Sequence, residues 1–225
     1  MRPVLFSVVF LALFSCASSP RPAVSLTGAA RYTLLDPAYL ETPLDAPQEI
    51  TGVYGSREIT MRAWVLADAA SVSMTFFDLF GVYLGELSFT EDGISFSFHK
   101  ALPSSLKPEY IIADFQLCFY RIDALSRNLK AGGLSITESR SVDPNGNPAV
   151  TRVIYEGKKG KKGAPPLIEI EKTDTTVRYT NHARRYGFTV SNGSSMAAPS
   201  PTVPAWPPVV SERCNTLSGE RAGCC

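Results

Sequence analysis

Alternation of apolar and polar residues over positions 49–99 is the feature that most constrains the fold of this chain. Within the stretch 57–67, Ile59, Met61, Ala63 and Val65 fall on one face and mostly polar residues on the other, as in a half-buried strand. Turn sequences such as Glu91-Asp92-Gly93 separate successive runs and favour hairpins. The predicted strands are 49–54, 57–67, 71–78, 82–90 and 94–99. Because their connections are too short for crossover helices, we expect an antiparallel meander.

The middle of the chain changes to a helical pattern. Residues 104–108 are typical of a capped helix start, with Pro108 in the first turn. A predicted helix over 110–120 brings Ile111, Phe115 and Cys118 to one face, and Cys118 is expected to be a small buried hydrophobe. A second helix, 122–130, ends at Gly132-Gly133. Five more strands are predicted at 134–139, 150–155, 167–172, 175–180 and 185–190.

Together these elements predict a mainly β (α+β) fold. We expect an incomplete antiparallel β-barrel, or a strongly curved sheet of about ten strands, with the two mid-chain helices covering its concave face. Such a fold leaves an apolar-lined space between sheet and helices, where ligands commonly bind.

The first sixteen residues have the layout of a secretory signal: Arg2, an apolar run over 4–14, then small residues. As a helix this run would be about 16 Å long, roughly half of a bilayer core. The step Leu13-Phe14-Ser15-Cys16 resembles the lipobox of bacterial lipoproteins, which implies a lipidated Cys16 and a signal over 1–15. The alternative is a secreted protein with a cysteine near its cleavage site. The absence of Asp after Cys16 favours the outer membrane in a Gram-negative cell, with the domain facing the periplasm.

Three further segments complete the expected organisation. Residues 16–30 form the lipidated N-terminus and tether, 31–190 the folded domain, and 191–225 a disordered Ser/Pro-rich tail. The chain has 22 Lys and Arg against 21 Asp and Glu. Because these charges nearly balance, the chain lacks the large positive charge that would indicate nucleic acid as a partner. Two His and five Cys suggest neither a His-based metal site nor a disulfide framework. No cofactor is expected.

Four segments of the sequence carry a family resemblance. They are RYTLLDPAYL (31–40), ITGVYGSREITMRAWVLAD (50–68), FFDLFGVYLGELSFTEDGISF (76–96) and ALPSSLKPEYIIADFQLCFYRIDALSRNL (101–129). They resemble a family of bacterial lipoproteins of unknown function, often encoded beside aryl-polyene synthesis genes. That family is distantly similar to the lipoprotein carriers LolA and LolB, which implies an incomplete β-barrel closed by helices over roughly 31–190. It has no catalytic signature.

Aromatic residues are the candidates for lining an acyl cavity, although they could equally form a dry core. The candidates are Trp64, Phe76, Phe80, Tyr83, Phe115 and Phe119. Asp114 is conspicuous in an apolar helix. It could face solvent, bond helix to sheet, or contact a ligand head group. The basic turn 182–185 could be a solvated hairpin or could meet anionic head groups.

A cluster of lysines between glycines is the strongest concentration of charge. Lys158, Lys159, Lys161 and Lys162 suit either a solvated hairpin tip or contact with a membrane or partner. The cluster lacks the Gly-Lys-Ser/Thr step of a phosphate loop.

The sequence favours a binding protein over an enzyme. It has no Gly-x-Ser-x-Gly elbow, and neither His lies in a nucleophile motif. One hypothesis is a lipid-anchored carrier or receptor that binds or transfers acyl lipid, aryl-polyene lipid included, or the acyl chains of a lipoprotein. The other is a structural or adaptor lipoprotein with a filled cavity, which docks an envelope protein. In both, the N-terminal acyl chains contact the membrane.

Overall fold

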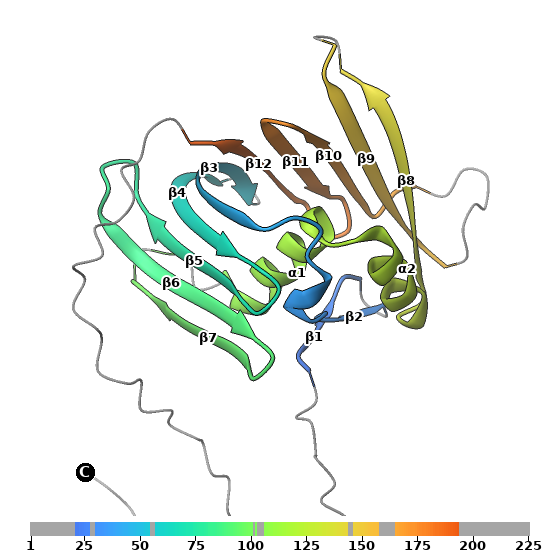
Figure 1. The fold of residues 1–225 in the computed structure, drawn as a ribbon, viewed down its shortest axis with the longest axis horizontal. Helices are drawn as coiled ribbons and strands as arrows, with labels where there is room; N and C mark the ends of the chain where they lie inside the picture. Colours follow the sequence, from blue (N-terminus) through green and yellow to red (C-terminus); the bar gives the residue numbers. More distant parts are fainter. Residues whose placement is uncertain are drawn as a thin grey trace, which may run out of the picture. The chain divides into compact units, whose positions relative to one another are not determined.

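The structure, a computed structural model, describes residues 21–27, 30–54, 57–100, 102, 106–143, 146–157 and 165–193 (Figure 1). The chain divides into two units, Met1–Ser195 and Met196–Cys225, and every described residue belongs to the first. The predictions for Cys16, the signal, the four lysines of 158–162 and the tail beyond 193 lie outside the described residues.

One antiparallel sheet dominates the fold. Its strands are β3 (Leu44–Tyr54), β4 (Arg57–Ala67), β5 (Val72–Phe77), β6 (Tyr83–Thr90), β7 (Gly93–Phe98), β8 (Leu134–Val142), β9 (Pro148–Glu156), β10 (Ile168–Thr173), β11 (Thr176–Asn181) and β12 (Tyr186–Asn192). The spatial order is β7-β6-β5-β4-β3-β12-β11-β10-β9-β8. Two five-strand meanders therefore meet where β3 pairs with β12, with Ile50 opposite Val190. The sheet is not closed into a barrel, and the predicted fold class is confirmed.

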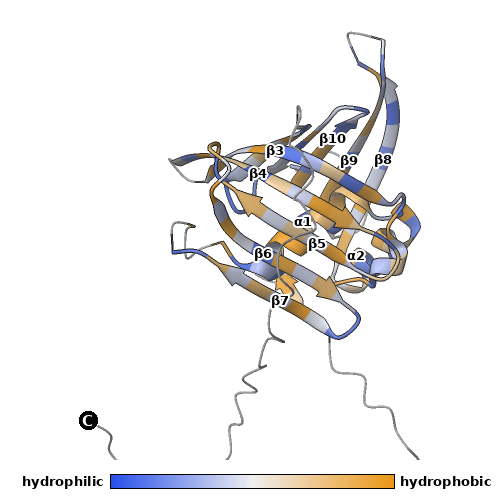
Figure 2. Cartoon of the chain, turned by 60° about the vertical axis from the view of Figure 1, so that its left-hand side comes forward, coloured by the Kyte–Doolittle hydropathy of each residue, from blue (hydrophilic) through white to orange (hydrophobic). Residues whose placement is uncertain are grey.

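The strands form where the sequence alternates. On β4, Met61, Ala63 and Val65 are buried, and Leu66, between two buried neighbours, is exposed. On β5, Val72, Met74 and Phe76 are buried in the same way. Bands of hydrophobic and more hydrophilic colour follow one another along these strands in Figure 2. The sheet thus has one apolar face that must be covered.

Two helices cross that face. The chain leaves the sheet at the β7 edge, forms α1 (Pro108–Phe119) and α2 (Ile122–Ala131), and re-enters at the β8 edge (Figure 1). Gly132 caps the C-terminal end of α2, and an added Cβ there would lie 1.9 Å from the carbonyl oxygen of Arg31. Only glycine allows the end of α2 to approach the N-terminal segment this closely.

The N-terminal segment packs against both helices. It forms β1 (Ala23–Ser25), β2 (Arg31–Thr33) and the 3-10 helix η1 (Pro37–Tyr39). Val24, Leu26, Tyr32 and Leu34 are all buried. Within the range 16–30 predicted as lipidated N-terminus and tether, residues 23–26 pack against the rest of the described fold. A strand of three residues is too short to show alternation, so periodicity does not predict it.

Candidate ligand-binding groove

An open groove lies between α1 and strands β3, β4, β5 and β12. Its volume is about 190 Å³, and about 1120 Å³ when the space continuous with solvent is included. Aliphatic, methionine and phenylalanine side chains dominate the lining on the sheet side, among them Ile50, Ile59, Met61, Met74 and Phe188. A concave apolar surface with few polar groups is the usual form of a small-molecule site.

Helix α1 presents one complete face to this groove. Its contribution recurs every three or four residues: Tyr110, Ile111, Asp114, Phe115, Cys118 and Phe119. This spacing follows one side of a helix with 3.6 residues per turn. The opposite side carries Ile112, Ala113, Gln116 and Leu117, which are all buried. Helix α1 therefore has one face in the closed core and one face in the groove.

Three of the six predicted cavity aromatics lie in the groove lining. Phe76 comes from β5, and Phe115 and Phe119 come from α1, where their ring centroids are 4.8 Å apart. Cys118 lies beside them and is buried, and burial raises the pKa of its thiol well above the usual range.

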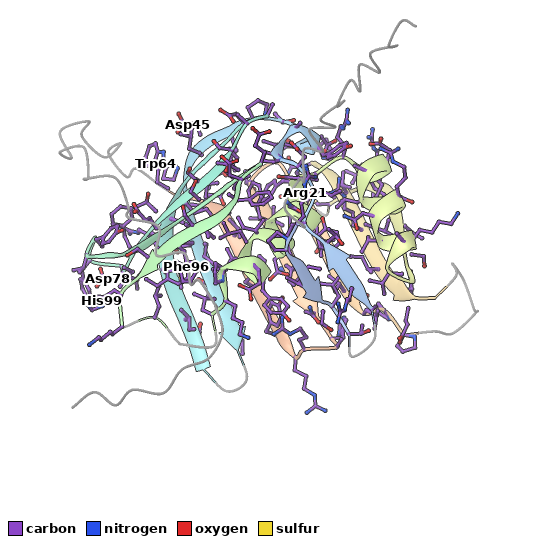
Figure 3. All side chains as sticks on the ribbon, turned by 90° about the horizontal axis from the view of Figure 1, so that it is seen from below. Arg21, Asp45, Trp64, Asp78, Phe96 and His99 are labelled. Carbon is purple, nitrogen blue, oxygen red and sulfur yellow. The ribbon has the colours of Figure 1, made fainter. Side chains whose placement is uncertain are left out.

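The other three candidates, Trp64, Phe80 and Tyr83, are not among the residues that line this groove. Trp64 alternates with Ala63 and Val65, so it projects from the other face of β4. There its Nε1 donates to Asp45 at 2.9 Å (Figure 3). Phe80 lies in a turn and is 92% exposed, and Tyr83 is also exposed at the start of β6. The aromatic residues of the sequence suggested a cavity. Where each ring points depends on its place in the alternation of a strand, or on its position in a turn.

The turn between β5 and β6 is an ordered surface feature that sequence reasoning missed. One carboxylate oxygen of Asp78 accepts hydrogen bonds from the backbone N–H groups of Phe80 and Val82, both at 2.8 Å. Leu79, Phe80 and Val82 are exposed. Neighbouring apolar side chains held outward in this way are typical of a contact surface.

Asp114 is the acidic residue of the groove lining and is only 8% exposed. Its carboxylate accepts from the Tyr179 hydroxyl at 2.6 Å and from the Tyr186 hydroxyl at 2.7 Å. Burial raises the pKa of Asp114 to about 6, although both tyrosine hydrogen bonds and the charge of Arg184 lower it. Of the roles left open for Asp114, bonding between helix and sheet is therefore present, and the residue also borders the groove.

The basic turn 182–185 divides its side chains between solvent and groove. His182 and Arg185 are exposed, and His182 lies 3.0 Å from Glu169. Arg184 is half-buried and lines the groove. Its guanidinium carbon is 3.7 Å from the ring centroid of Tyr110 on α1, a cation–π contact. Within this turn, His182 and Arg185 are thus solvated, and contact with an anionic head group stays a prediction.

The other side of α1 is fixed by buried polar contacts. Gln116 accepts from the Tyr32 hydroxyl and from the Leu35 N–H, each at 2.9 Å, and donates to the Leu35 carbonyl at 2.8 Å. Arg152 on β9 donates to the carbonyl oxygens of Leu117 and Cys118 at 3.0 and 3.1 Å, and to Glu138 at 2.9 Å. A cation at the C-terminal end of a helix is also favoured by the helix dipole.

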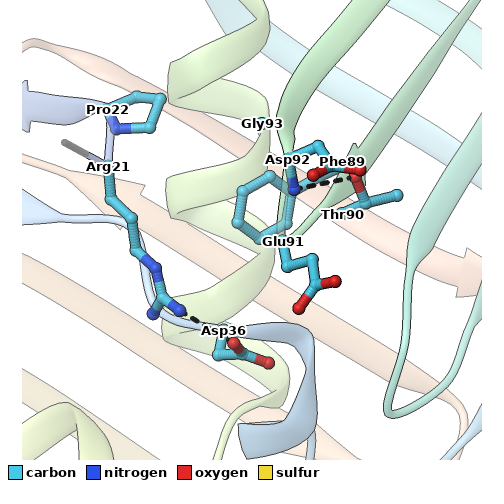
Figure 4. A pocket seen from close by; sticks show the side chains of 8 residues that line it. All are labelled: Arg21, Pro22, Asp36, Phe89, Thr90, Glu91, Asp92 and Gly93. Carbon is cyan, nitrogen blue, oxygen red and sulfur yellow. Dashed lines mark hydrogen bonds and ion pairs between the residues drawn. The ribbon is translucent and has the colours of Figure 1, made fainter. Parts of the chain in front are cut away.

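A second hollow lies beside the N-terminal segment and the β6–β7 turn (Figure 4). Its volume is about 30 Å³, which is the space of about one water molecule. Arg21 and Asp36 form an ion pair of 2.8 Å at its border. The hollow is too small for a larger ligand, which leaves the groove as the better candidate.

Two further properties of the described residues bear on the site. Nowhere among them do three or more His, Cys, Asp or Glu side chains gather as a metal-ligand group would require. Neither described helix is long and apolar enough to span a membrane.

Comparisons with known proteins give a family match and distant structural likenesses. The family model of a protein of unknown function, DUF3261, matches residues 45–192. No curated protein matches the chain. A crystal structure of a DUF1329 family protein from Desulfovibrio piger is similar over 72% of this chain and 96% of that chain, with 9% sequence identity and a TM-score of 0.22. A likeness at this score supports no conclusion about function.

Proposed function

We propose that this chain, which belongs to the DUF3261 family of unknown function, binds or transfers acyl lipid, or the acyl chains of a lipoprotein, at the outer membrane. The observation that carries the proposal is the apolar groove between α1 and the sheet. Its charged side chains are Lys107, Asp114 and Arg184. An elongated apolar ligand with one polar end matches such a lining.

The groove is polar at one end and apolar along its length. Lys107 precedes α1, and Arg184 stacks on Tyr110 in its first turn. Phe119 ends the helix, about 14 Å beyond Tyr110 at 1.5 Å per residue. Between them the lining is mainly aliphatic and aromatic, with Asp114 as its carboxylate. An aryl-polyene lipid is one cargo with this polarity, and the proposed role is binding rather than catalysis.

Lipidation of Cys16 is part of the same proposal. Each buried acyl CH₂ contributes about 0.8 kcal/mol and one chain holds only marginally, so stable anchoring requires two or three chains. Lys158, Lys159, Lys161 and Lys162 remain candidates for a second contact, worth roughly 1 kcal/mol each near an anionic surface. A periplasm-facing anchor would place the groove beside its lipid source.

An adaptor role is the second candidate, and the β5–β6 turn favours it. Leu79, Phe80 and Val82 are exposed together, and such a patch suits docking of an envelope protein. In this case crosslinking would recover one protein partner repeatedly and no lipid.

Lipid analysis of the full chain carrying Cys16→Ala tests the main proposal. We expect mass spectrometry of an organic extract to detect co-purifying lipid, and a fluorescent polyene fatty acid to bind. Ile59→Trp should fill the groove and weaken binding at least about ten-fold, because Ile59 is in the lining. Thr60→Trp, on the other face of β4, is the matched control. If the chain carries no lipid and binds no fatty acid, the proposal fails.

A further inference from the structure

Arg184 has an unusual environment for a charged side chain. It lines an apolar groove and is half-buried. Its contacts are aromatic: the guanidinium carbon lies 3.7 Å from the Tyr110 ring centroid and 5.8 Å from that of Tyr186. Among the ion pairs of the described residues, none includes Arg184. The guanidinium is thus positioned without a carboxylate in direct contact.

Asp114, the acidic residue of the lining, is hydrogen-bonded to other side chains and not to Arg184. Asp114 uses its carboxylate oxygens to accept from Tyr179 and Tyr186. Arg184 influences Asp114 through its charge only. The five N–H donors of a guanidinium need acceptors, and stacking on Tyr110 satisfies none of them. The donors of Arg184 remain available to a ligand.

The surrounding charges favour an anion. Lys107 and Arg184 contribute two positive charges to the lining, against one carboxylate from Asp114. Glu109 lies in the first turn of α1 but does not line the groove. Charge interactions are stronger beside apolar walls than in bulk water. The guanidinium fork matches carboxylate and phosphate oxygens bidentately.

We infer that Arg184 holds the anionic head group, carboxylate or phosphate, of an acyl chain lying in the groove. This inference rests on the proposed function and names the chemical class of its ligand. Arg184 recognises the head, Lys107 adds positive charge at the mouth, and the apolar lining toward Phe119 takes the chain.

Three probes with the same polyene chain test this inference on the Cys16→Ala chain. They are cis-parinaric acid, its uncharged methyl ester, and a phosphatidic acid carrying the same chain. We expect the better anionic probe to bind at least about ten-fold more tightly than the ester, since a charge-assisted hydrogen bond is worth about that much. The tighter of the two anionic probes identifies a carboxylate or a phosphate head.

Variants assign the selectivity to one side chain. Arg184→Gln should abolish the preference for the anion and leave ester binding within about two-fold. Arg184→Lys keeps the charge without the fork and should retain part of the preference. Arg185→Gln, one residue away and exposed, is the matched control and should behave as wild type. Asp114→Asn removes the negative charge from the lining and should tighten anion binding.

The outcomes separate this inference from the proposed function. If ester and acids bind equally well, the inference is wrong while the acyl groove stands. If Arg184→Gln weakens all three probes equally, Arg184 only supports the fold, and the inference is again wrong. If no probe binds to the folded chain, the proposed function fails and the inference fails with it.

Discussion

Asp114 and Gln116 lie two residues apart on α1 and face opposite sides of the helix, one an open groove and the other closed packing. Gln116 is fully buried, and its amide makes three hydrogen bonds to the N-terminal segment. Asp114 borders the groove and bonds to the sheet through two tyrosine hydroxyls. The N-terminal segment covers one face of the helix. The other face lies toward the sheet, from which the groove partly separates it.

This difference shows how one helix can serve structure and binding together. On the closed side, the amide of Gln116 and the guanidinium of Arg152 are hydrogen-bonded to other groups of the chain, and an unmatched buried group costs about 1–3 kcal/mol. On the groove side, Arg184 retains donors that no described carboxylate contacts directly. Hydrogen-bond donors that border the groove and have no acceptor among the described residues are the ones available to a ligand. Substitutions should therefore separate the two sides by their effects on stability and on binding.

Loss of Arg152 should give the largest loss of stability. Arg152→Met leaves Glu138 and the carbonyl groups at the end of α1 without their donor. Breaking a buried ion pair by removing one partner costs about 3–5 kcal/mol. Urea unfolding should report this loss. The same change at Arg178, whose ion pair with Glu171 is exposed, should cost less than about 1 kcal/mol. Equal losses would show that the contacts of Arg152 contribute no more to the free energy of unfolding than those of a surface arginine.

Gln116→Leu should be the next most damaging substitution. It leaves the Tyr32 hydroxyl and both backbone groups of Leu35 without a partner, at a cost of about 3 kcal/mol. Gln48→Leu is the matched control in the groove lining, where no side-chain hydrogen bond of Gln48 joins it to another described residue. We expect the control to change the unfolding midpoint in urea little. If Gln48→Leu lowered the free energy of unfolding more than Gln116→Leu, the groove side and not the closed side would depend on buried hydrogen bonds.

Asp114 should make stability depend on pH. Its pKa is raised from 3.8 to about 6 in the folded chain, so the folded chain binds more protons than the unfolded chain between about pH 4 and pH 6. The free energy of unfolding should therefore fall as the pH rises through this window, by about 3 kcal/mol. Asp114→Asn should remove this component. Parallel stability profiles of the two proteins between pH 4 and pH 7 would contradict it.

The sequence predicted the sheet because alternation is a local signal, and β4 and β5 display it over many residues. It also predicted the groove face of α1 through the spacing of Ile111, Phe115 and Cys118. The partners of Asp114 are 65 and 72 residues away, and the pairing of β3 with β12 is likewise non-local. No local pattern encodes such contacts. For the same reason the inward turn of Arg184 could not be separated from the outward turn of Arg185.

Ile111→Ala should show the smallest effect on stability and the clearest contrast between the two sides of α1. Ile111 is half-buried in the groove lining, so its truncation enlarges a space that is already open and should cost about 1 kcal/mol. Leu117→Ala, on the closed side and fully buried, creates a new cavity and should cost about 2–5 kcal/mol. Thermal unfolding of both variants, with and without bound polyene fatty acid, measures the contrast. If both truncations cost the same, the space beside Ile111 is packed in solution, and the groove is no binding site.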